Sequence, residues 1–138
     1  MTASYDTQRV SRLDLVEGLR AEHARMLADL DRLSRALLRA PRSDFPRARA
    51  ALEDWLRDEL LPHAHREQYT YDLVGRMGSG ALHRSLEAEH RKLREAAESF
   101  AEVWNCRVAG TWARSLYAAF DGLRRKEEEL LFPRLLTA

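Results

Sequence analysis

The sequence predicts an all-α protein, folded as an antiparallel up-down-up-down four-helix bundle. Apolar residues recur at intervals of three and four through four long stretches, the spacing that gives a helix one apolar face. No segment shows the strict alternation of a half-buried strand. Short connections between long helices make consecutive helices antiparallel neighbours. The length of 138 residues suits one domain, residues 1–138, in which the polar, aperiodic residues 1–10 are expected to form a loose lead-in.

The first two predicted helices are delimited by serine and proline. Ser11 is a candidate N-cap of the first helix, and Pro41 ends it. Ser43 is a candidate N-cap of the second helix, which has Pro46 in its first turn. Pro62 lies inside the second apolar stretch and cannot donate a backbone hydrogen bond. We therefore expect a kink at that point, within a continuing helix.

The last two predicted helices are separated by loops. Gly78-Ser79-Gly80 breaks the chain after the second helix. The third helix is expected over residues 81–104, followed by a loop over residues 105–110. The fourth helix is expected from about residue 111 to near Pro133.

Composition and charge exclude several classes of partner. The formal net charge is +1, with acidic and basic residues interspersed, so nothing favours nucleic acid or an anionic membrane. Lys92 and Lys126 are the only lysines, and every other residue of the Lys-plus-Arg count is an arginine. Cys106 is alone, which excludes an intramolecular disulfide and fits a reducing compartment. Because neither a signal-peptide core nor a membrane-spanning run is present, a soluble cytoplasmic protein is expected, of open oligomeric state.

Five polar residues interrupt the apolar faces of the predicted helices. His63 and Glu67 lie one turn apart on the second helix, while His23, His90 and Glu127 lie on the other three. Counted from one common end of the bundle, they lie roughly 9–14 residues in, so they fall within roughly 8 Å along the axis. Groups of this kind are costly to bury unless they are paired, hydrogen-bonded or bound to a metal. Their convergence from all four helices predicts a metal site.

The donor types narrow the choice of metal. Imidazole and carboxylate without thiolate suit iron, manganese or zinc, and disfavour copper(I) or an iron–sulfur cluster. Glu67 and Glu127 come from opposite hairpins and are placed to bridge a pair of ions, with histidines completing each ion. The alternative for each residue is a buried side chain that is hydrogen-bonded to a neighbour.

Residues near these five are expected to have ordinary roles. His65 points away from His63 and is expected to be exposed. His83 is too far along the axis to join the others and is expected at the end of the bundle. Tyr71 is expected to pack in the core, within reach of a hydrogen bond to Glu67. Glu128 is expected on a solvated face, paired with nearby arginine side chains.

Four sequence motifs carry a family resemblance. They are AEH ending at His23, LLPH-x-x-x-E at His63 and Glu67, EAEH ending at His90, and KEEELLFP around Glu127. Together they resemble the hemerythrin family, in its bacterial HHE cation-binding branch, over nearly the whole chain. The resemblance implies a non-heme di-iron site in a four-helix bundle, with histidine terminal ligands and two bridging carboxylates. The implied activities are dioxygen carriage, sensing of oxygen or nitric oxide, and iron or redox handling.

One position departs from the family pattern. Leu123 stands where the family places a histidine, four residues before the last glutamate. Glu87, one turn before His90, is a possible oxygen ligand in its place. The expected function is metal binding or sensing of a small diatomic or redox ligand, more than enzymatic turnover. Two alternatives are open: an iron or peroxide oxidoreductase at an open iron position, and a metal-free bundle that serves as an interaction module.

Overall fold

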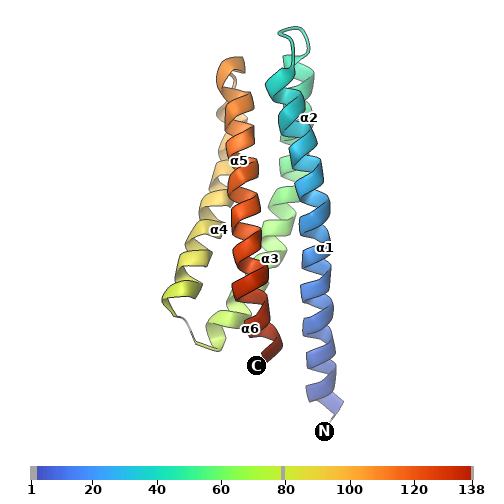
Figure 1. Ribbon diagram of the computed structural model, residues 1–138, viewed down its shortest axis with the longest axis vertical. Coiled ribbons are helices and arrows are strands. Elements are labelled where there is room, and N and C mark those ends of the chain that lie inside the picture. Colours follow the sequence, from blue (N-terminus) through green and yellow to red (C-terminus); the bar gives the residue numbers. More distant parts are fainter. Residues whose placement is uncertain (1–2, 79, 138) are drawn as a thin grey trace.

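The protein is all-helical in the part of the chain that its computed structural model describes, residues 3–78 and 80–137, with side chains described from residue 11. Figure 1 shows the long helical segments lying side by side, with the α1–α2 connection at one end and the α3–α4 connection at the other. No described helix is long and apolar enough to cross a membrane. The elements are α1 (Ala3–Arg39), α2 (Phe45–Trp55), η1 (Leu56–Leu60), α3 (Leu61–Arg76), α4 (Ala81–Ser99), η2 (Phe100–Glu102), α5 (Cys106–Lys126), η3 (Glu127–Leu131) and α6 (Phe132–Thr137).

The helix starts differ from the expected ones in three places. α1 begins at Ala3, within the stretch expected as a loose lead-in, and residues 1–2 lie outside the described part. α2 is preceded by Asp44 and not Ser43 at the N-cap. α5 begins several residues early because Asn105 caps it, its side-chain oxygen accepting a hydrogen bond from the Arg107 backbone N–H at 2.9 Å. The expected break after α3 is present at Gly78 and Gly80, whereas Ser79 lies outside the described residues.

Pro62 and Pro133 each follow a π-helical turn. The expected distortion at Pro62 takes this form: η1 ends with the Leu61 N–H bonded to the Leu56 carbonyl, and the helix then continues as α3. η3 does the same before Pro133. Since proline has no N–H to donate, a wider turn just before it absorbs the lost bond without ending the helix. η3 begins at Glu127, one of the five predicted ligands.

The core consists of the inner faces of the helical segments. On α1 it contains the apolar stripe that the periodicity predicted, namely Val16, Leu19, Met26, Leu30, Leu33 and Leu37. The apolar stripe is interrupted at His23, whose ring is 1 % exposed. Phe132 stacks on this ring, nearly parallel at a centroid distance of 5.9 Å, and Phe120 meets it edge-on at the same distance. Aromatic side chains therefore close one side of the polar cluster.

Arg49 is a buried cation that closes one end of the bundle. Its guanidinium donates to the backbone carbonyls of Val103, Phe100 and Ala101 at 2.8, 2.9 and 3.0 Å, and it lies 3.5 Å from the centroid of the Trp104 ring. These carbonyls follow the end of α4, where the regular helical hydrogen bonds run out, although the Phe100 carbonyl also accepts from the Val103 backbone N–H at 2.9 Å. A cation from α2 thus caps the α4–η2 segment.

Candidate metal centre

All five predicted ligands lie in one buried polar cluster. His23 comes from α1, His63 and Glu67 from α3, His90 from α4 and Glu127 from the first residue of η3. None of them is more than 2 % exposed. Two groups within the cluster have donor atoms close enough together to hold a metal ion, and Glu67 belongs to both. The sequence therefore identified residues that the fold brings together.

The first group consists of His23, His63 and Glu67. The Glu67 Oε2 atom lies 2.8 Å from His23 Nε2 and 3.2 Å from His63 Nε2. The two imidazole rings meet edge-on with centroids 4.9 Å apart. Both Nε2 atoms and the carboxylate oxygen thus converge on one point, as the donors of a common ion do.

The second group consists of Glu67, His90 and Glu127. His90 Nε2 lies 3.7 Å from Glu67 Oε1, too far for a hydrogen bond. Both ring nitrogens of His90 are buried without a hydrogen-bond partner in the described part of the chain. Tyr71 donates a hydrogen bond of 2.6 Å to Glu127 Oε2, and its ring lies 4.9 Å from that of His90. Tyr71 was expected to reach Glu67, and its partner is instead the glutamate of the opposite hairpin.

Each histidine of the first group has a carboxylate behind it. His63 Nδ1 donates to Glu22 Oε2 at 2.6 Å, and His23 Nδ1 donates to Glu128 Oε2 at 3.1 Å. Such a carboxylate fixes the tautomer and the ring orientation of a metal-binding histidine, leaving Nε2 to face the ion. Arginine side chains hold both carboxylates: Arg66 bonds Glu22 at 3.1 Å, and an arginine of α5 lies near Glu128.

The two supporting carboxylates were not predicted as part of the site. Glu128 was expected on a solvated face, but its side chain is only 21 % exposed and bonds His23 as well as pairing with Arg124. Glu22 lies in the AEH motif next to His23, yet its partner is His63 on the neighbouring segment. The sequence did place a glutamate, Glu22, directly before His23. That it bonds His63 depends on side-chain directions across two helices, which residue spacing along one helix does not give.

The pKa values of the two buried glutamates, Glu67 and Glu127, are shifted in opposite directions. Burial would raise the pKa of Glu67, but hydrogen bonds with Glu127, His23 and His63 hold it well below its ordinary value. Burial and the adjacent charge of Glu67 raise the pKa of Glu127 well above its ordinary value. The metal-free cluster thus holds one ionised and one protonated carboxyl group, as expected for two buried acids that share a proton.

The pKa values of His63, in the first group, and His90, in the second, are shifted in opposite directions. Burial would lower the pKa of His63, but its hydrogen bonds with Glu67 and Glu22 raise it above the ordinary value. Burial lowers the pKa of His90, which has no such bond. His90 is therefore held as a neutral imidazole, the form that binds a metal.

Other residues considered from the sequence lie outside both groups. Leu123 is buried, only 4 % exposed, and belongs to the apolar core. Glu87, considered as a substitute ligand, is in neither group, and its side chain accepts a hydrogen bond of 3.4 Å from Gln68. His65 is exposed, as expected. His83 is buried with its Nε2 2.9 Å from the Tyr71 carbonyl, so it packs against α3 beyond the cluster.

The residues of the cluster fit a metal ion by their chemistry. The donors are imidazole nitrogens and carboxylate oxygens, a set that suits iron, manganese or zinc. Buried polar atoms normally have hydrogen-bond partners, but the ring nitrogens of His90 have none among the described residues. A purely structural hydrogen-bond network therefore does not account for His90. Metal binding at Nε2 would satisfy one of the two nitrogens.

The comparisons with known proteins point to the same kind of site. The family model described as the hemerythrin HHE cation-binding domain matches residues 14–135, which contain all five residues of the cluster and both supporting carboxylates. No curated protein and no solved structure gives a significant match. Because the family model covers most of the chain, this protein belongs to the hemerythrin HHE cation-binding domain family.

Proposed function

We propose that the chain is a non-heme iron protein in which iron at the buried cluster binds or senses dioxygen, nitric oxide or another small redox ligand. The observation that carries the proposal is that Glu67 is shared by two groups of donors, one of which includes the unbonded nitrogens of His90. The proposal includes the antiparallel up-down-up-down order of the helices, one domain, and a reducing cytoplasmic setting. Manganese or zinc would suit the same donors.

The two metal positions that we propose are unequal. The first would be held by His23, His63 and Glu67, whose histidines are already oriented by carboxylates. The second would be held by His90, Glu127 and the other oxygen of Glu67. No carboxylate orients His90 from behind among the described side chains, and the second position also lacks the histidine ligand that Leu123 replaces. We therefore expect the first position to fill at lower metal concentration.

Iron bound there would supply redox chemistry and a coordination position for a small ligand. The chain's own residues determine what surrounds it. Phe120 and Phe132 cover the His23 side with apolar rings, which keeps water away from the first position. The Tyr71 hydroxyl donates a hydrogen bond to Glu127 Oε2, next to the second position. The protein thus contributes ordered donors, an apolar cover and one buried phenol.

An oxidoreductase that oxidises ferrous iron or consumes peroxide is a second candidate, favoured by Leu123. An apolar side chain at this place leaves the second position short of a ligand, and an open position is where a substrate can bind an ion. Turnover of ferrous iron or peroxide above the rate of free iron would support this candidate. A metal-free module is less favoured, because it offers no partner for the His90 nitrogens.

The test is metal counting on matched variants. Purified protein is loaded anaerobically with ferrous iron, desalted and analysed for metal per chain. Glu67→Gln, in the ligand shared by both groups, is expected to lose nearly all metal, and His90→Gln only the metal of the second position. His65→Gln on the exposed face of α3 is the matched control and keeps the wild-type content. Full metal retention by Glu67→Gln would contradict the proposal.

A further inference from the structure

A groove on the surface between α4 and α5 is separate from the polar cluster. Its volume is about 460 Å³, within the range of roughly 300–1,000 Å³ typical of small-molecule sites. Buried Leu93, Leu116 and Leu123 line its inner side, and Ala119 and Gly122 keep its outer side open because they are small. Figure 1 shows α4 leaning away from α5 toward the N-terminal end of α4.

Two contacts mark the ends of this α4–α5 groove. At one end, the Lys126 ammonium pairs with Glu89 of α4 at 2.8 Å. At the other end, Trp112 of α5 stacks on Phe100, with ring centroids 4.9 Å apart. Lys126 follows Trp112 by fourteen positions, which is about 21 Å along a helix. The groove is therefore long enough for an extended chain of methylene groups.

Positive charge is concentrated at one end of the groove. Lys92 and Lys126 both line it, although they are the only lysines in the chain. Lys92 is exposed and has no ion-pair partner among the described side chains. The Lys126–Glu89 pair has both side chains well exposed, at 50 % and 39 %, so water screens it and it can rearrange readily. With two ammonium groups and one carboxylate, this end has a net charge of +1.

We propose that the α4–α5 groove binds a fatty acid or another single-chain amphiphile with a carboxylate head. The carboxylate lies between Lys92 and Lys126, and the hydrocarbon chain runs over Ala119 and Gly122 toward Trp112. Burial of the chain against leucine side chains supplies the driving force, since apolar surface leaves water. The lysines set the direction of the ligand, because the groove has cations at one end and an aromatic ring at the other. This proposal does not depend on the metal centre.

Titration of dodecanoate into the purified chain tests the proposal. The probe is kept below its micelle-forming concentration, and binding is followed by calorimetry and by tryptophan fluorescence. Saturable binding of one dodecanoate per chain is expected, with a fluorescence change that disappears in Trp112→Phe. Dodecanol is expected to bind about tenfold more weakly, because it has the same chain without the charge. The absence of saturable dodecanoate binding would overturn the proposal.

A pair of glycine variants locates the binding. A side chain added at Gly122 meets nothing within 4 Å, so Gly122→Leu fills the groove without a backbone clash. Gly18 on α1 is equally free of neighbours and lies outside the groove, so Gly18→Leu is the matched control. Gly122→Leu is expected to weaken dodecanoate binding by more than about tenfold, and Gly18→Leu to leave it unchanged. Equal binding by both variants would overturn the assignment to this groove.

Charge removal and oligomeric state complete the test. The double variant with Lys92→Gln and Lys126→Gln is expected to bind dodecanoate about tenfold more weakly, while its dodecanol binding stays the same. Equal loss for both probes would overturn the carboxylate as the recognised group. Sedimentation reports whether a second copy occupies the groove instead. A dimer that Gly122→Leu dissociates and Gly18→Leu does not would overturn the proposal in favour of self-association.

Discussion

Glu22 is expected to control the metal affinity of the first position without contacting the metal. Its Oε2 atom accepts a hydrogen bond from His63 Nδ1 at 2.6 Å, and Arg66 holds its other oxygen at 3.1 Å. Burial alone would raise the pKa of Glu22, but the hydrogen bonds with His63 and Arg66 lower it, so the group is ionised near neutral pH. A negative charge behind the imidazole makes Nε2 a better donor and holds the ring in place.

Two substitutions separate the charge from the hydrogen bond. Glu22→Gln keeps an oxygen that can accept from His63 Nδ1, but it removes the charge. Glu22→Ala removes both and leaves the buried N–H of His63 unsatisfied. Loss of such a supporting carboxylate typically weakens metal binding by about 10–100-fold, or roughly 1.4–2.7 kcal/mol. We expect Glu22→Gln near the lower limit of this range and Glu22→Ala near the upper limit.

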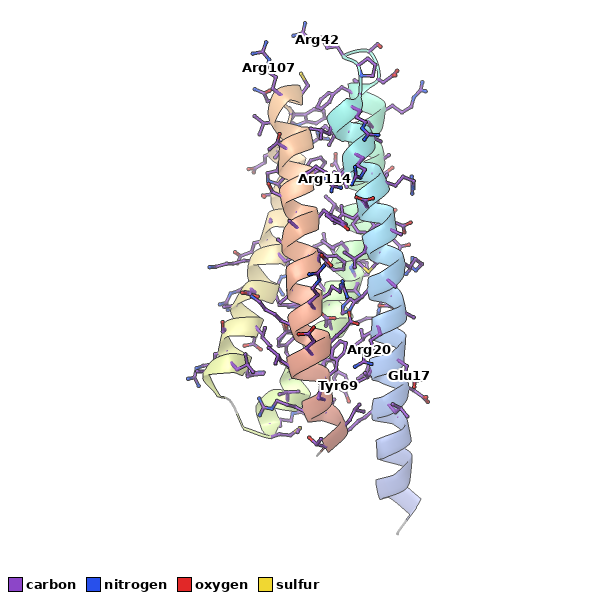
Figure 2. The ribbon with its side chains drawn as sticks, in the orientation of Figure 1. Glu17, Arg20, Arg42, Tyr69, Arg107 and Arg114 are labelled. Atoms are coloured by element: carbon purple, nitrogen blue, oxygen red, sulfur yellow. The ribbon has the colours of Figure 1, made fainter. Side chains whose placement is uncertain are left out.

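The assay is competition for ferrous iron or zinc against a coloured chelator, which resolves stepwise binding to the two positions. Only the first position is expected to weaken, because neither nitrogen of His90 bonds a carboxylate among the described side chains. Glu17→Gln is the matched control: Glu17 is an exposed glutamate on the same helix, and Figure 2 shows it pointing away from the bundle. Unchanged affinity in Glu22→Ala, or an equal loss in Glu17→Gln, would refute the reasoning.

The same pair predicts a pH window for stability of the metal-free protein. The pKa of Glu22 is lowered from 4.5 in the folded state, so its contribution is present above about pH 4.5 and is lost as pH falls through the folded value. The pKa of His63 is raised from 6.5, so its contribution is present below about pH 6.5 and is lost as pH rises through the folded value. The difference in unfolding free energy between wild type and Glu22→Gln should therefore be largest between these two values. Urea denaturation across pH measures it, and a difference that grows steadily above pH 6.5 would contradict the pairing.

Three further variants test other parts of the fold and site. Arg49→Met is expected to lower the free energy of unfolding by about 3 kcal/mol, because three backbone carbonyls lose a charged donor. Urea denaturation measures this change, and Arg47→Met at an exposed position is the control, expected to leave the free energy of unfolding unchanged. Tyr71→Phe is expected to cost about 1–3 kcal/mol in the metal-free protein, since Glu127 loses its buried hydroxyl donor, and a neutral effect in denaturation would contradict this. Leu123→His is expected to raise metal content toward two per chain after iron loading, at some cost in core packing; unchanged metal content would show that the histidine cannot reach the second position.

The helical architecture was predictable because it depends on local periodicity. The stripe from Val16 to Leu37 is apolar at helical spacing and is buried as expected. The helix starts were less predictable, because they depend on which of several polar residues turns its side chain onto a free N–H. Asn105 does so before α5, whereas Ser43 does not before α2. The π-helical turns were also missed. A proline inside a helix indicates that the helix is distorted there, but it does not indicate which kind of distortion occurs.

The ligands were predictable to a greater extent than the residues that support them. Helical rise alone places residues of different helices at one level, and this brought the five residues of the cluster together. The partner of a side chain at the same level depends on its rotamer and on the rotation of the next helix. This is why Glu22 was passed over and why Tyr71 was assigned to the glutamate on its own helix instead of to Glu127.

Leu123 connects the metal centre with the groove between α4 and α5. It lies four residues before Glu127, on the helix face that carries the second group of donors, and it also lines the groove. A histidine there would need a polar partner for its second nitrogen, which the buried groove side chains Leu93 and Leu116 do not offer. Under the proposed function, the same leucine leaves the second metal position short of a ligand and contributes an apolar side chain to the groove. A metal ion and an apolar groove make opposite demands on this position, and here it carries a leucine that lines the groove.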